Sequence, residues 1–151
     1  MATKNFRVEI EGDVELIQKL NKMSQGFRSK ALLHAVTQGA EIVKREASAR
    51  APVRSGRLSR SIAIVKLKST NKLAKVAVSW RKGKASRTAA FYGIMVEKGT
   101  RPRRRKDGVR TGTGPARPFL IPAYLSKRQE VAREIKVQLS RLLRKAAKKG
   151  L

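Results

Sequence analysis

The residues of this chain best suited to bind a ligand form a dense basic run in its second half. Arg101, Arg103, Arg104, Arg105 and Lys106 lie close together, and Arg110 follows shortly after. Lysine and arginine neutralise phosphates without reading a base sequence. Because the run contains no aromatic residue, it lacks the side chains that stack on bases. We therefore predict that these six residues contact a protein partner or DNA.

Catalytic and metal-binding chemistry has little to be built from. The chain has no cysteine, and His34 is its only histidine, which excludes disulfides, thiolate nucleophiles and multi-histidine metal sites. Ser69–Lys72 matches S-x-x-K but falls at a predicted turn, and Gly112–Gly114 lacks the third glycine of a dinucleotide loop. We predict no catalytic, metal-binding or cofactor-binding residue and expect His34 to be exposed.

The net charge requires an anionic partner. Lysine and arginine number 37, aspartate and glutamate 10, so the 151 residues carry +27. Nucleic acid, an anionic membrane surface or an acidic protein could match this charge. The charge is polarised, because four acids lie between Glu9 and Glu15 whereas the last residues are strongly basic. No apolar run approaches the roughly 18 residues of a membrane span, and residues 1–13 lack the pattern of a signal or transit peptide.

The spacing of apolar residues predicts an α+β chain that forms a single domain over residues 1–151. A small antiparallel sheet, built on a central hairpin, is expected to pack against a long helix of the N-terminal half and a basic C-terminal helix. The predicted elements are a strand at 6–10, helices at 13–23 and 27–50, a hairpin of 58–68 with 73–81, an apolar segment at 89–97 that is either a strand or a helical turn, and a helix at 122–148.

Three details of these elements bear on packing. Gly39 lies in the middle of the long helix, where glycine costs about 1 kcal/mol relative to alanine, so we expect a neighbouring backbone to approach it closely. Leu125 and Leu142 are expected in the buried stripe of the last helix together with Val131, Ile135, Leu139, Leu143 and Ala146. Ser24, Gln25 and Gly26 are expected to separate the two N-terminal helices.

Residues 98–118 form a long glycine- and proline-containing segment that includes the basic run. At this length it exceeds ordinary loops, so we expect an irregular loop that is functional or becomes ordered on binding. For the last residues, 148–151, the sequence leaves order and disorder both open.

Three motifs occur in a characteristic order along the chain. They read A-P-V-R-S-G-R-L at 51–58, Y-x-x-x-V-E-x-G-T at 92–100 and G-P-A-R-P-F-L-x-P-A at 114–123. Together they resemble the small tail-component family of long-tailed bacteriophages, the neck or tail-completion proteins, over roughly residues 8–145. The motif positions are Pro52, Gly56, Leu58, Tyr92, Glu97, Gly99, Thr100, Pro115, Pro118 and Phe119.

The resemblance implies a structural virion protein and not an enzyme. Members of the family are thought to act at the head–tail junction, as ring-forming subunits with six-fold symmetry or a multiple of it. The implied partners are acidic portal, connector, tail-tube or terminator proteins, with non-specific contact to DNA in the channel and no membrane contact. The implied location is the neck or tail of the virion, and the host cytoplasm during assembly.

Several motif residues have an expected structural role. Gly56 and Gly99 permit backbone conformations closed to other residues. Pro115 and Pro118 are expected to stiffen the approach to the last helix, and Phe119 to anchor that helix in the core.

Glu97 is the acidic residue of the second motif and lies beside the arginine-rich segment. We expect it to pair with Arg57, Arg60 or Arg101, within one subunit or across a ring interface. The alternative is a solvated charge at the end of a strand.

Two other protein classes fit part of the sequence. A basic nucleic-acid-binding protein of ribosomal or nucleoid type explains the charge but not the three ordered motifs. A membrane-surface protein would use the amphipathic C-terminal helix; we expect the leucine stripe of that helix to be needed for the core instead.

Overall fold

The fold is that of a computed structural model, which describes residues 14–53, 56–67, 69–70, 73–80, 87–104 and 106–148. Helices and strands are mixed as expected for an α+β chain, which confirms the predicted class. The elements are α1 (Val14–Lys22), α2 (Gln25–Arg50), α3 (Arg57–Ser61), β1 (Ile62–Lys66), β2 (Val76–Trp80), α4 (Arg87–Lys98), β3 (Arg103–Arg104), β4 (Arg110–Thr111) and α5 (Leu120–Lys148). The predicted strand at 6–10 and the tail at 149–151 lie outside the described residues.

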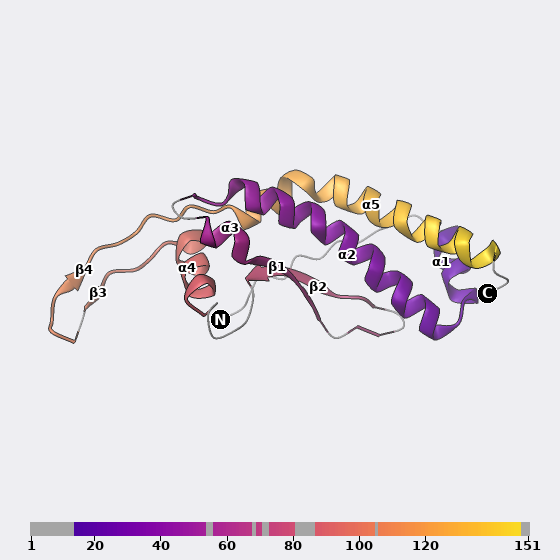
Figure 1. The fold of residues 1–151 in the computed structure, drawn as a ribbon, viewed down its shortest axis with the longest axis horizontal. Coiled ribbons are helices and arrows are strands. Elements are labelled where there is room, and N and C mark those ends of the chain that lie inside the picture. Colours follow the sequence, from indigo (N-terminus) through magenta and orange to yellow (C-terminus); the bar gives the residue numbers. More distant parts are fainter. Residues whose placement is uncertain are drawn as a thin grey trace.

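Helices α2 and α5 lie side by side along the length of the elongated molecule (Figure 1) and share the most extensive contact of any two described elements. Helix α2 begins after Ser24, whose hydroxyl oxygen accepts a hydrogen bond from the Phe27 N–H at 3.4 Å. Serine at this position satisfies an N–H that has no partner within the helix. Ser24 therefore caps α2, which starts at Gln25, two residues before the predicted position.

The main hydrophobic core lies between α1, α2 and α5. Small residues line the buried face of α2, and branched residues line that of α5; the cluster consists of Leu16, Leu20, Ala35, Val43, Val131, Ile135, Leu139 and Leu143. His34 of α2 is exposed, as predicted. Burial of these apolar side chains supplies the main attraction between the helices.

Helices α2 and α5 approach each other closely at Gly39. A Cβ atom at this position would lie 2.9 Å from Ile135 Cγ1 and 3.1 Å from Val131 Cγ1. We expected a neighbouring backbone close to Gly39. That was wrong, because the close neighbours are two branched side chains of α5. Gly39 forms a notch in α2 that receives them.

A second hydrophobic cluster closes the opposite end of the two long helices. Its buried members are Ala47, Ala51, Leu58, Ile62, Phe119 and Ala123, and Val78 and Trp80 pack against it. Val78 also packs against the first cluster, so the hairpin joins the two.

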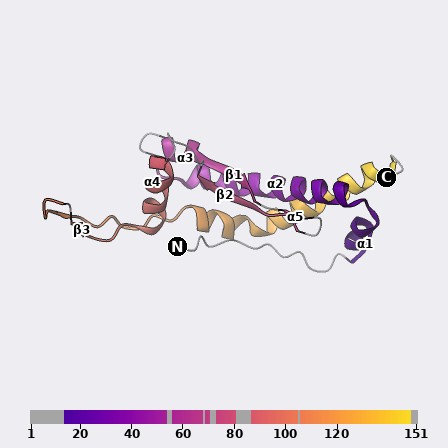
Figure 2. The same ribbon diagram turned by 90° about the horizontal axis from the view of Figure 1, so that it is seen from below.

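The β1–β2 hairpin is antiparallel, with Ile62 opposite Trp80 and Ile64 opposite Val78, and lies along α2 (Figure 2). Its first strand was predicted to start at 58, but residues 57–61 form α3. Gly56 has a φ of +65° and lets the chain turn directly into this helix. The Ser59 hydroxyl donates a hydrogen bond to the Ser48 carbonyl of α2 at 3.0 Å, which holds α3 in place.

The segment at 89–97, for which strand and helical turn were both open, belongs to helix α4. Gly93 of α4 is buried, and a Cβ atom there would overlap the Trp80 indole. Glycine therefore allows α4 to cross the end of the hairpin at close range.

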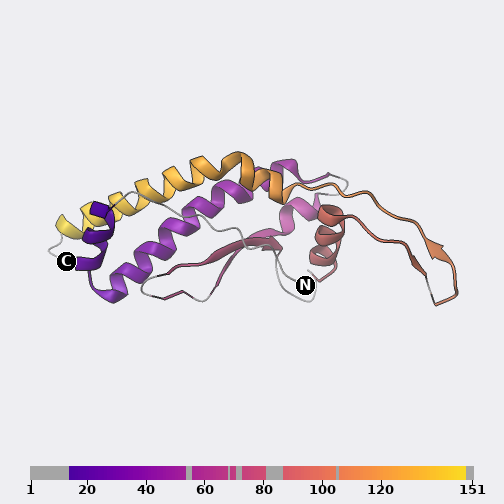
Figure 3. The same cartoon turned by 180° about the vertical axis from the view of Figure 1, so that it is seen from behind.

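Residues 99–119 leave the body of the molecule and return to it (Figures 1 and 3). The segment was expected to be irregular throughout, but β3 and β4 pair in antiparallel fashion, with Arg104 opposite Arg110. It is therefore an extended two-stranded arm.

Helix α5 begins at Leu120, two residues earlier than predicted. Leu125 was expected in its buried stripe but is 54% exposed. The end of α2 is level with this turn, since Arg50 Nη2 donates to Ser126 Oγ at 3.2 Å. The first turn of α5 therefore packs through Phe119 and Ala123, and Leu125 is left outside.

The notch at Gly39 gives a direct test of the helix packing. Gly39→Leu is expected to lower the free energy of unfolding by about 1–3 kcal/mol, because the new side chain overpacks the contact with Ile135. Gly26→Leu is the matched control, since a Cβ atom at Gly26 in the same helix meets nothing within 4 Å. Chemical denaturation measures both variants. Equal midpoints for the two would contradict the close contact.

Candidate interaction site

The predicted contact residues lie on the two-stranded segment 101–117, which we call the basic arm. Arg101, Arg104, Lys106 and Arg110 are exposed, and Arg103 lies on β3. Arg105 lies outside the described residues. Among the described residues, the four exposed cations pair with no carboxylate. The arm therefore presents unneutralised charge to its surroundings.

The pairing of the two strands places like charges together. Arg104 and Arg110 are directly opposite each other across the ladder, an arrangement that destabilises a strand pair. Asp107 is the one acid of the arm, and its Oδ1 accepts a hydrogen bond from the Val109 N–H at 3.1 Å. With Gly108 at a φ of +80°, this bond closes the tip of the arm.

Apolar contacts do little to hold the arm. Val109, its only large apolar residue, is 56% exposed, and the next one along the chain is Phe119 in the body. A two-stranded hairpin without a packed face is marginally stable in water. The position of the arm must therefore be set at its base.

Hydrogen bonds at the base join the two halves of the arm. The Thr100 N–H donates to the Gly114 carbonyl at 3.0 Å, and the Gly114 N–H donates to Thr100 Oγ1 at 2.7 Å. The Arg117 N–H donates to the Val96 carbonyl of α4 at 2.7 Å. Gly99 has a φ of +73°, and a Cβ atom there would lie 2.9 Å from the Ala116 nitrogen and the Gly114 oxygen. These are backbone atoms, so Gly99 is required for the base to close.

Glu97 links this base to α5. Its Oε2 accepts hydrogen bonds from the N–H groups of Phe119 at 2.8 Å and Leu120 at 3.0 Å, and its Oε1 accepts one from Ile121 at 3.1 Å. Proline at 122 has no N–H, and the Ala123 N–H donates to the Phe119 carbonyl. Every backbone donor of the first turn of α5 is thus satisfied. The negative charge also interacts favourably with the positive end of the helix dipole.

The expectations for Glu97 missed this cap. We expected an arginine partner for Glu97 and did not predict the three backbone N–H groups that donate to its carboxylate. The alternative of a solvated charge at a strand end was wrong, because Glu97 lies on α4 and is 8% exposed. No motif in the sequence marks a helix cap supplied from more than twenty residues away, as this one is.

The other motif residues fall into two groups. Leu58 and Phe119 are buried together in the second cluster, whereas Tyr92, Pro115 and Pro118 are exposed. Pro52 follows the end of α2, which stops at Arg50. The motifs therefore meet around the start of α5, and the exposed members are available to a partner.

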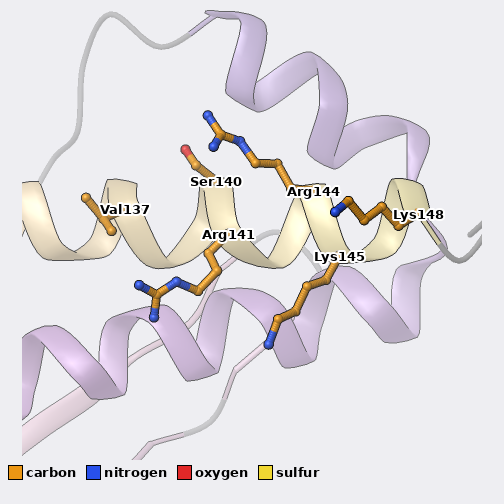
Figure 4. A pocket seen from close by; sticks show the side chains of 6 residues that line it. All are labelled: Val137, Ser140, Arg141, Arg144, Lys145 and Lys148. Atoms are coloured by element: carbon orange, nitrogen blue, oxygen red, sulfur yellow. The ribbon is translucent and has the colours of Figure 1, made fainter.

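A second basic surface lies on α5, the helix that the sequence predicted to be basic on one face. Figure 4 shows basic side chains along one face of α5, where they line a shallow depression of about 530 Å³. We call this set the α5 stripe; its lining residues include Val137, Ser140, Arg141, Arg144, Lys145 and Lys148. Its cations, Arg141, Arg144, Lys145 and Lys148, follow one another at intervals of three, one and three residues. The stripe and the basic arm lie at opposite ends of the molecule (Figure 1).

Exposed lysine–glutamate ion pairs within helices cause the clear pKa shifts among the described residues. Lys127 Nζ lies 2.8 Å from Glu130 Oε2, so the lysine lowers the pKa of Glu130 and the glutamate raises the pKa of Lys127. Lys19 likewise lowers the pKa of Glu15. Such exposed pairs contribute little to stability.

Metal sites and membrane spans are both absent from the part of the chain that the structure describes. Its residues include no group of three or more histidine, aspartate or glutamate residues placed to hold a metal ion. None of the described helices combines the length and the apolar character that crossing a membrane requires.

Removal of the Glu97 carboxylate tests its role as the cap. Glu97→Ala leaves three backbone N–H groups without their acceptor and is expected to lower the free energy of unfolding by about 2–3 kcal/mol. Glu130→Ala, which removes an exposed carboxylate from α5, should leave the unfolding midpoint almost unchanged. Thermal or urea unfolding followed by circular dichroism compares the two. A Glu97 variant as stable as the Glu130 variant would refute the capping role.

The comparisons with known proteins bear on the body of the molecule. A family model described as "Bacteriophage HK97-gp10, putative tail-component" matches residues 14–99, more than half of the chain. The match runs from α1 through α4 and ends at Gly99, directly before the basic arm, so the third motif lies beyond it. No curated protein and no solved structure gives a significant match. By the match over α1 to α4, this chain belongs to the HK97-gp10-like family of bacteriophage tail components.

Proposed function

We propose that this chain is a structural subunit of the head–tail junction of a tailed bacteriophage, active in neck formation or tail completion. In this role it is not an enzyme, and it resides in the virion after assembly in the host cytoplasm. The observation that carries the proposal is the basic arm, whose exposed cations have no counter-charge among the described residues. Membership of a tail-component family supplies the setting.

The arrangement of the molecule suits a subunit of an assembly. The α2–α5 pair forms a body, and Glu97, Gly99 and Thr100 fix the base of the arm against it. At about 3.4 Å per residue, an extended stretch from Arg101 to Arg104 spans about 10 Å. A subunit of this form contacts its neighbours through the body and a central or adjacent ligand through the arm.

A closed ring, six-fold or a multiple of it, is the assembly that we propose. Each copy brings a formal charge of +27, and salt at 0.1 M screens charges only beyond about 10 Å. Ring closure therefore requires counter-charge from DNA or from acidic portal, connector, tail-tube or terminator proteins.

A basic nucleic-acid-binding protein of ribosomal or nucleoid type is the second candidate, and the net charge favours it. The two candidates differ in where the protein is found, because only a tail component copurifies with phage particles.

Purified virions test the proposed location. Mass spectrometry and immunogold labelling are expected to detect the chain in mature particles, with the label at the neck. Deletion of its gene should yield filled heads and tails that fail to join, and expression in trans should restore infectious particles. If the chain is absent from virions and stoichiometric in ribosomes or nucleoids, the proposal is wrong.

The salt dependence of assembly tests the need for counter-charge. The purified chain is expected to sediment as a small species in dilute buffer and to form rings only when an acidic partner or DNA is added. Analytical ultracentrifugation and negative-stain microscopy follow the change. A closed ring of the chain alone at low ionic strength would contradict the charge argument.

A further inference from the structure

We infer that the basic arm binds duplex DNA as a two-stranded ribbon that lies in a groove and contacts phosphates without reading base sequence. This deepens the proposed function, on which its biological setting rests, by naming the ligand of the arm. The inference itself concerns the isolated chain and is tested on it directly.

The composition of the arm favours phosphate over a protein surface. Protein interfaces rely on buried aromatic and apolar anchors at their centres. The arm has no aromatic residue, and its one large apolar residue, Val109, lies at the tip beside Gly108. Contacts to phosphates need only arginine, lysine and backbone N–H groups, and seven of the 17 residues of the arm are arginine or lysine.

The shape of the arm fits DNA as well. A two-stranded β-ribbon is one of the two elements that the major groove of DNA admits. Because opposed residues of a ladder project from the same face, Arg104 and Arg110 present their charges side by side. Arg101 and Lys106 lie nearer the base and the tip, so cations are spread along the length of the ribbon.

Phosphate binding would also relieve a strain within the arm. The Arg104–Arg110 pair repels itself across the strands when no anion is near. A phosphate between the two guanidinium groups replaces this repulsion by charge-assisted hydrogen bonds. Binding of DNA is therefore expected to strengthen the pairing of β3 with β4.

A charge-matched pair of variants of the full chain tests the inference. The arm variant carries Arg101→Gln, Arg104→Gln, Lys106→Gln and Arg110→Gln. The stripe variant carries Arg141→Gln, Arg144→Gln, Lys145→Gln and Lys148→Gln, which removes the same charge from exposed residues at the other end of the molecule. Circular dichroism establishes that both variants are folded. The probes are a fluorescent DNA duplex of mixed sequence and poly-glutamate as an unlabelled competitor.

Fluorescence anisotropy over a range of salt concentrations is expected to separate the two variants. The arm variant should bind the duplex at least about tenfold more weakly than the unmodified chain, with a log–log salt slope smaller by about 0.9 for each phosphate that the arm no longer neutralises. The stripe variant should keep most of its affinity. Duplexes of different sequence should bind alike, and poly-glutamate should compete poorly at equal charge.

Two results would overturn the inference. An equal loss of affinity in the two variants would show that net charge, and not the arm, binds DNA. Competition by poly-glutamate as effective as that by unlabelled duplex would point to an acidic protein as the ligand. Neither result bears on whether the chain occurs in virions, so failure of this inference is distinguishable from failure of the proposed function.

Discussion

The carboxylate of Glu97 joins the end of α4 and the adjoining base of the arm to the start of α5, which lies more than twenty residues further along the chain. It belongs to the last turn of α4, it lies beside the base of the basic arm, and it accepts the N–H groups of residues 119–121 at the start of α5. A buried carboxylate is costly unless its oxygens are hydrogen-bonded, and here both are. Because α5 forms one side of the core, an error in the position of Glu97 would shift both the helix and the arm.

Different interactions hold the basic arm and the body of the molecule. The body is held by apolar side chains buried between α1, α2 and α5, whereas the arm has no such core and carries repelling charges on facing strands. Closure of the base at Gly99 and Thr100 compensates for this. The base of the arm is thus fixed on the body, although the charges on β3 and β4 repel each other.

The sequence predicted features that depend on periodicity and failed for those that depend on distant partners. Most of the stripe residues of the two long helices, and the burial of Phe119, follow from local spacing and were predicted correctly, whereas Leu125 is exposed and Leu142 is only half-buried. The alternation of apolar and polar residues between 58 and 68 indicated one long strand. Residues 57–61 form α3 instead, because Gly56 adopts a positive φ and Leu58 is buried in the core. The partners of Glu97 were missed, because backbone N–H groups carry no mark in a sequence.

Gly39 has a consequence that reaches beyond its own contact. Two helices that pack through apolar stripes alone can shift along one another by one turn, about 5.4 Å, and still bury the same types of side chain. The side chains of Ile135 and Val131 fill the notch at Gly39, and a shift of one turn would move them out of it. The notch thereby fixes the register of α2 against α5, the two longest described helices.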